Sequence, residues 1–117
     1  MPLKMDVKQS AGVSVVTCHG TIVFGEEASA LRDRVKELAT GDAHLVLDLA
    51  QVSYVDSGGL GAIIGLFTSV RNAGGDMKLC CLNERVRHVF AITKLLNVVE
   101  IHNSVEDAVR AFSHAAA

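Results

Sequence analysis

Alternating hydrophobic and polar positions open the chain and predict a β-hairpin. Met5 and Val7 alternate with charged neighbours, and residues 13–19 are rich in β-branched side chains. Ala11 and Gly12 lie between these two stretches and offer a tight two-residue connection. We therefore predict that two antiparallel strands begin the fold.

Helical and strand-like patterns then alternate to the end of the chain. Apolar side chains at helical spacing predict four helices, and runs of apolar, β-favouring residues predict three more strands. The helices are predicted to start at Glu26 and Glu27, with Gly41 as the stop signal, at Gly58, after Asn83 and after Ser104. The strands are predicted over residues 45–49, 77–82 and 98–101.

The order of these elements, ββαβαβαβα, predicts the α/β class. A hairpin followed by strands that alternate with helices requires a mixed, mostly parallel sheet with helices packed on it. In such a sheet, functional residues lie outside the carboxyl ends of the parallel strands. We therefore expect residues 53–59 and 82–85 to share one edge of the molecule.

Chain length and composition predict one domain, spanning residues 1–117. The length is close to the commonest domain size, and 50% of the residues are hydrophobic. Only 4% are aromatic and none is tryptophan, so the core must consist of valine, leucine, isoleucine and alanine.

Charge and hydropathy exclude two classes of partner. The formal net charge is −2 and no segment forms a basic stripe, which argues against nucleic acid and against an anionic membrane surface. The N-terminus lacks an apolar run of signal-peptide length, and no stretch approaches the ~20 apolar residues of a membrane span. We therefore expect no membrane insertion and a cytoplasmic protein.

The three cysteines are predicted to be free thiols buried in apolar strands. Cys80 and Cys81 are adjacent, so in an extended strand they point to opposite faces, which disfavours a shared bridge. With Cys18 they make an odd number, as in proteins of a reducing compartment. The five histidines show no metal-ligand spacing, so no metal is expected.

Known catalytic motifs are absent, which predicts that the chain is not an enzyme and needs no cofactor. A nucleophile elbow would need glycine at Val55, and a dinucleotide fingerprint would need glycine at Ile64. A phosphate loop would need Gly-Lys followed by serine or threonine, and the chain has no such sequence.

A glycine-rich helix start follows the strand at 45–49 after a short loop. Asp56 and Ser57 suit a helix cap, and they also present a hydroxyl and free backbone N–H groups that could receive a phosphate. Capping does not explain Gly58, Gly59 and Gly61, since each glycine costs roughly 0.5–1 kcal/mol relative to alanine.

Two explanations for these glycines remain open. Gly61 and Gly65 lie four residues apart, so they could form a groove that lets the helix approach a neighbour closely. Alternatively, the glycines clear room around Ser57 for a partner protein or a phosphate.

A similar choice applies to Val23 and Phe24, two large apolar residues before the first helix. They either plug the end of the core, which we expect first, or form a partner-contact patch.

The chain resembles the STAS-domain anti-sigma-factor antagonists, a family of small cytoplasmic bacterial switch proteins. The resemblance covers nearly the whole length, and its central block is a specific signal. The matching positions are 20–22, 47–49, 52, 55–61, 71–75, 77–79, 86–90 and from 95 onward.

The resemblance implies a STAS fold and a function in partner switching. In such proteins the unphosphorylated antagonist binds an anti-sigma factor that is also a serine kinase of the histidine-kinase-like ATPase class, and this binding frees a sigma factor. Phosphorylation at the start of the second helix releases the antagonist, and a phosphatase resets the cycle.

Two positions depart from the pattern that the resemblance brings. The usual motif is Asp-Ser-Ser/Thr-Gly, in which the second hydroxyl residue accepts the phosphate, and this chain has Gly58 at that position. Sporulation-type members carry an aspartate where this chain has Val23. Either Ser57 is the phosphoacceptor instead, or the protein is not switched by phosphorylation. The partner-binding residues implied are Asp56, Ser57, Gly58, Gly59, Leu60, Val23, Phe24 and Asn83.

A second function class stays open beside the first. A STAS interaction subunit of a larger complex, such as a lipid-transport ATPase or a stress-signalling assembly, would bind its partner without phosphorylation, which suits the missing acceptor. A nucleotide-binding function rests on glycine content alone, and the pattern leaves open whether the chain forms a homodimer.

Overall fold

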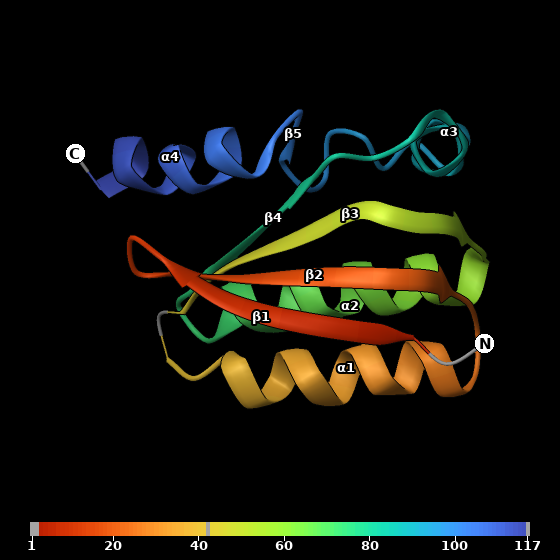
Figure 1. Cartoon of the computed structure of the whole chain (residues 1–117), viewed down its shortest axis with the longest axis horizontal. Helices are drawn as coiled ribbons and strands as arrows, with labels where there is room; N and C mark the ends of the chain where they lie inside the picture. Colours follow the sequence, from red (N-terminus) through yellow and green to blue (C-terminus); the bar gives the residue numbers. More distant parts are fainter. Residues whose placement is uncertain (1–2, 42, 117) are drawn as a thin grey trace.

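A five-stranded sheet in the order β1-β2-β3-β4-β5 organises the computed structural model, which describes residues 3–41 and 43–116 (Figure 1). The strands are β1 (Lys4–Ser10), β2 (Val13–Ile22), β3 (His44–Val55), β4 (Asp76–Cys80) and β5 (Ile101–His102). The helices are α1 (Glu26–Leu38), α2 (Ser57–Asn72), α3 (Glu84–Ile92) and α4 (Val105–Ala116). The predicted order ββαβαβαβα is confirmed.

The pairing of the strands confirms the mixed, mostly parallel sheet. β1 and β2 are antiparallel, and the pairs β2–β3, β3–β4 and β4–β5 are parallel. Ala11 and Gly12 close the hairpin with φ angles of 51° and 80°. Positive φ at both turn residues matches the right-handed twist of the strands, which explains the predicted tight connection.

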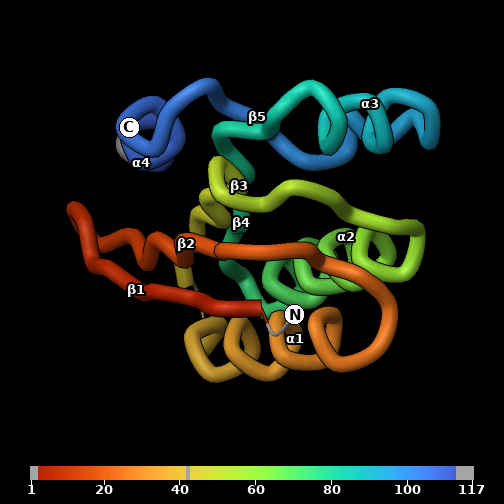
Figure 2. The backbone as a smooth tube through the Cα atoms, turned by 45° about the vertical axis from the view of Figure 1, so that its right-hand side comes forward, coloured from red at the N-terminus to blue at the C-terminus, as the bar shows by residue number. Residues whose placement is uncertain are grey.

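Helices cover both faces of the sheet. α1 and α2 lie side by side against one face, and α4 lies against the other (Figures 1 and 2). The larger core joins buried side chains of α1, α2 and α3, such as Leu31, Ile63 and Phe90, to the sheet. A smaller core lies under α4 and includes Val46 and Phe112. As expected, buried aliphatic residues dominate both cores.

Several boundaries differ from the sequence prediction, among them the end of β4, which lies at Cys80 and not at Leu82. β3 runs to Val55, because residues expected in a short loop pair with β2 through two register shifts. α1 ends at Leu38, short of Gly41. β5 comprises only Ile101 and His102, since the chain before it turns, with the Val98 N–H donating to the Leu95 carbonyl at 3.1 Å.

The parallel arrangement brings three helix starts to one edge. β2 leads into α1, β3 into α2 and β4 into α3, and all three helices begin on the right-hand side of Figure 1. Residues 53–59 span the end of β3 and the start of α2, and residues 82–85 span the connection from β4 into the start of α3. This edge is therefore where the residues singled out in the sequence meet.

Candidate functional site

Asp56 joins the start of α2 to the loop before α1. Its Oδ1 accepts a 2.7 Å hydrogen bond from the backbone N–H of Gly59, which is the predicted helix cap. The same carboxylate accepts the backbone N–H of Phe24, at 3.1 Å to Oδ1 and 3.2 Å to Oδ2. The Asp56 N–H donates to the Ile22 carbonyl at 3.3 Å. The carboxylate therefore serves to hold the two segments together.

Gly58 and Gly59 are required by the close approach of this loop. A Cβ at position 58 would lie 2.5 Å from the Cβ of Phe24, and one at position 59 would lie 1.8 Å from the carbonyl oxygen of Ile22. Non-bonded carbon atoms prefer about 3.5–4.0 Å. Close internal contact thus explains this pair of glycines.

Gly61 and Gly65 have a different environment. A Cβ at either position would meet no atom within 4 Å, because both residues lie on the exposed side of α2. The predicted close-approach groove is therefore wrong. The close approach occurs one turn earlier, at the start of the helix.

The side chains at this edge divide into exposed and buried groups. Ser57 is exposed, and Phe24 is 81% exposed, although it contacts Gly58. The expectation that Phe24 plugs the core is wrong, since the side chain is largely exposed and only its Cβ and one edge of the ring lie against Gly58. Val23 is half-buried. Gly59 and Leu60 are buried, with Leu60 only 4% exposed, so they support the surface from below.

Asn83 fixes the start of α3 against the neighbouring strand β3. Its Oδ1 accepts the Val86 N–H at 2.8 Å, as the predicted cap requires, and its Nδ2 donates to the Val52 carbonyl at 2.9 Å. Both polar groups of the amide are thus engaged within the protein. The residue positions α3 beside the end of β3.

The sequence placed Tyr54 and Arg85 at this edge, within residues 53–59 and 82–85, but neither was named as a partner-binding residue. Tyr54 is 40% exposed near the end of β3, and the Arg85 guanidinium lies over its ring, 5.6 Å from the centroid. Tyr54 was expected in a loop, so the alternation of buried and exposed side chains along a strand was not used to predict its exposure. We define the strand-end surface as Phe24, Tyr54, Ser57, Asn83 and Arg85.

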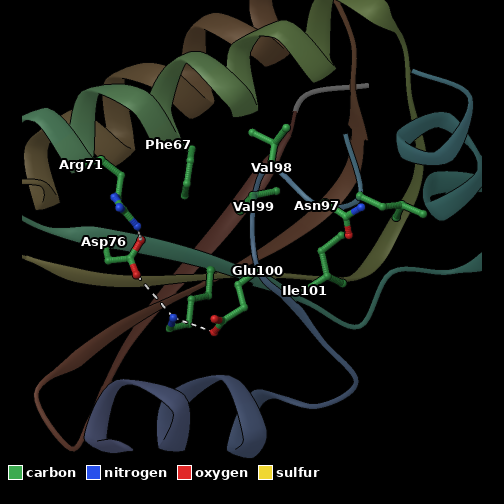
Figure 3. A pocket seen from close by; sticks show the side chains of 10 residues that line it. Phe67, Arg71, Asp76, Asn97, Val98, Val99, Glu100 and Ile101 are labelled. Carbon is green, nitrogen blue, oxygen red and sulfur yellow. Dashed lines mark hydrogen bonds and ion pairs between the residues drawn. The ribbon is translucent and has the colours of Figure 1, made fainter. Parts of the chain in front are cut away.

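A hollow lies away from this surface, between α2, β4 and the segment before β5 (Figure 3). It encloses about 400 Å³, and its wall includes Arg71, Asp76, Lys78 and Glu100. These charges pair with one another: Asp76 with Arg71 at 3.4 Å and with Lys78 at 3.4 Å, and Lys78 with Glu100 at 2.6 Å. The hydrogen bond from Lys78 lowers the pKa of Glu100, and His102 lowers it further. Because these charges already pair with one another, the wall has little net attraction for a charged ligand.

Comparison with known proteins identifies the family. The model of the STAS domain matches residues 4–108. The chain is also 38% identical over 111 residues to the anti-sigma-B factor antagonist of Bacillus subtilis, which covers 94% of this chain and 100% of that protein. The chain belongs to the STAS-domain family of anti-sigma factor antagonists. The expected function class, an antagonist and not an enzyme, is thereby confirmed.

Solved structures of the family share the fold. An anti-sigma factor antagonist from Mycobacterium paratuberculosis has a TM-score of 0.78 at 23% identity, over 93% of this chain and 92% of that one. SpoIIAA in its unphosphorylated form has a TM-score of 0.75 at 16% identity, over 95% and 97%. The cell fate determinant SpoIIAA of Bacillus has been solved in the phosphorylated form, with a TM-score of 0.68 at 16% identity, over 93% of this chain and 99% of that one.

Membership of the family of anti-sigma factor antagonists gives the kind of partner, because an antagonist acts on an anti-sigma factor. Within residues 3–41 and 43–116, no helix combines the length and the apolar content that crossing a membrane requires. The strand-end surface is the part of the described structure where exposed aromatic side chains and a free hydroxyl lie at three helix starts.

Proposed function

We propose that this chain binds an anti-sigma factor of the kinase-like ATPase class through the strand-end surface, and so frees a sigma factor. One observation carries the location: Phe24, in the loop before α1, is 81% exposed and lies against Gly58 at the start of α2. Exposing an apolar side chain to water is unfavourable, and burying it in an interface with a partner lowers the free energy.

The backbone contacts of Phe24 make it a preorganised anchor. Its N–H is held by Asp56, and its Cβ packs against Gly58. A partner therefore meets a ring whose attachment point is already ordered, which lowers the entropy lost on binding. Tyr54 and Arg85 extend the same contact with a stacked aromatic ring and a charge. Aromatic residues and arginine are the side chains enriched at interface hot spots.

Binding tests the proposal directly. Titration calorimetry should compare the wild type with Phe24→Ala, using the cognate anti-sigma factor. We expect Phe24→Ala to weaken binding by about 30-fold or more, equal to the ~2 kcal/mol of a hot-spot residue. Ile92→Ala is the matched control, because Ile92 is also an exposed apolar residue, 64% exposed at the far end of α3. Equal affinity of Phe24→Ala and wild type would refute the location.

Ser57 is the proposed phosphoacceptor. It is exposed as the first residue of α2, whereas position 58 has neither a hydroxyl nor room for a Cβ. A phosphate there would gain from the positive end of the helix dipole. It would add roughly −1.5 to −2 charge beside Asp56 and Phe24, which would break an apolar contact with the partner.

Mass spectrometry tests the acceptor. The protein is incubated with its kinase and ATP, and the intact mass is measured. We expect one phosphate on the wild type and on Ser69→Ala, an exposed serine at the other end of α2, and none on Ser57→Ala. Phosphate on Ser57→Ala, or none on the wild type, would refute this assignment.

The remaining parts of the proposal concern the setting of the chain. We propose a single STAS domain over residues 1–117 that works in the cytoplasm, where its sigma-factor system operates. Light scattering after size-exclusion chromatography tests whether the free antagonist is a monomer or a homodimer.

A further inference from the structure

Two cysteines and one aspartate form a cluster on the face of the sheet that α4 covers. One ligand atom each from Asp48, Cys80 and Cys81 lies within 4.8 Å of the others. Cys80 is buried, while Asp48 and Cys81 are half-buried, so the cluster is reachable from solvent on one side. It takes no part in the strand-end surface.

The register of the sheet and one unusual backbone angle create this cluster. β3 and β4 pair with Asp48 opposite Cys80, which places both side chains on one face. Cys81 has a φ of 66°, outside the extended region, so the alternation of faces breaks after Cys80. The expectation that the two thiols point to opposite faces is therefore wrong. Cys81 is held in place by its N–H, which donates to the His102 carbonyl at 3.0 Å.

We propose that Asp48, Cys80 and Cys81 bind a thiolate-preferring metal ion, with Zn²⁺ as the first choice. Two thiolates and a carboxylate supply three ligands of the type that zinc selects, and leave a fourth position for water. Zinc binds sulfur at about 2.3 Å and carboxylate oxygen at about 2.0–2.2 Å, which separates the ligand atoms of a tetrahedral site by about 3.5–3.8 Å. The three atoms, which lie within 4.8 Å of one another, must therefore draw together by at most about 1 Å. The half-buried side chains of Asp48 and Cys81 allow this movement.

Negative charge near the thiols favours a cation. The carboxylates of Asp48 and Glu106 both lie close enough to Cys80 to act on its thiol electrostatically. On binding, a metal ion would replace the two thiol protons and offset this negative charge.

Hydrogen bonds already orient the carboxylate. The Ala50 N–H donates to Asp48 Oδ1 at 3.1 Å, and the Thr17 hydroxyl donates to Oδ2 at 3.4 Å. Partners of this kind set the orientation of a metal-binding side chain. The sequence shows no metal-ligand spacing because Asp48 and Cys80 come from neighbouring strands and Cys81 directly follows β4.

Titration of the reduced, tag-free protein with Co²⁺ and then Zn²⁺ tests the site. Co²⁺ bound by thiolates shows sulfur-to-metal charge-transfer absorption, which histidine sites lack, and Zn²⁺ should abolish it at one equivalent per chain. We expect Cys81→Ser and Cys80→Ser to lower the affinity by more than about 100-fold, since even outer-shell partners are worth about 10- to 100-fold. Asp48→Asn should weaken binding to a smaller extent.

Cys18→Ser is the matched control, because Cys18 is a buried cysteine that packs in the other core. It should bind metal as the wild type does, and circular dichroism should show that each variant is folded. No saturable binding, binding without charge-transfer absorption, or binding retained by the double variant Cys80→Ser/Cys81→Ser would overturn the proposal.

Discussion

Helix α2 contains two pairs of glycines that look alike in the sequence and differ in the structure. Gly58 and Gly59 lie under the loop before α1, where an added Cβ would come within 2.5 and 1.8 Å of other atoms. Gly61 and Gly65 face open space. Only the first pair serves the strand-end surface. The comparison shows that a glycine-rich helix start marks a close approach only where another segment occupies the space of the missing side chains.

Gly59→Ala should have the largest effect. The new Cβ would meet the backbone carbonyl of Ile22, which cannot move without disturbing β2. We expect a loss of about 3 kcal/mol in the free energy of unfolding, at the upper end for overpacking. Thermal unfolding should show a melting temperature lower by more than about 10 °C. A melting temperature equal to that of the wild type would contradict the tight contact.

Gly58→Ser should be the next most damaging change, at about 2 kcal/mol. It restores the hydroxyl that the resemblance places at the acceptor position, but its Cβ would meet Phe24. Phe24 lies in an exposed loop and can shift, so the effect should be smaller than at Gly59. Urea unfolding of the single variants and of Phe24→Gly/Gly58→Ser completes a double-mutant cycle. Additive effects would show that Phe24 is not the obstacle.

Asp56→Ala should cost about 1–2 kcal/mol. It removes the cap of α2 and the acceptor for the Phe24 N–H together. Urea unfolding measures the loss. Asp33→Ala on the exposed side of α1 is the control and should stay within about 0.5 kcal/mol of the wild type. A loss at Asp56 no larger than this control would mean that the carboxylate does not tie the two segments.

Gly61→Ala and Gly65→Ala should have the smallest effect and the opposite sign. Each alanine gains helix propensity and meets no atom, so each should stabilise the protein by roughly 0.5–1 kcal/mol. Urea unfolding measures the gain. Destabilisation by either alanine would place a hidden contact on the exposed side of α2 and remove the difference between the two pairs.

The two helix caps illustrate what could be predicted. Asn83 and Asp56 precede apolar residues at helical spacing, and each accepts the backbone N–H three residues later. Both bonds are local, so sequence spacing was sufficient to predict them. Their second bonds, from Asn83 to Val52 and from Phe24 to Asp56, join segments about 30 residues apart. Spacing along the chain contains no information on these long-range contacts.

The sequence alone determined the order of elements, the mostly parallel sheet, the helix caps and the family, because hydrophobic periodicity and short motifs depend on neighbouring residues. The tertiary structure decided three other matters. It showed that Phe24 is exposed, that Gly58 and Gly59 receive the loop from β2, and that Asp48 meets Cys80 and Cys81. Each depends on strand register or on a single backbone angle. Those quantities are set by packing between distant segments, so they could not be read from local pattern.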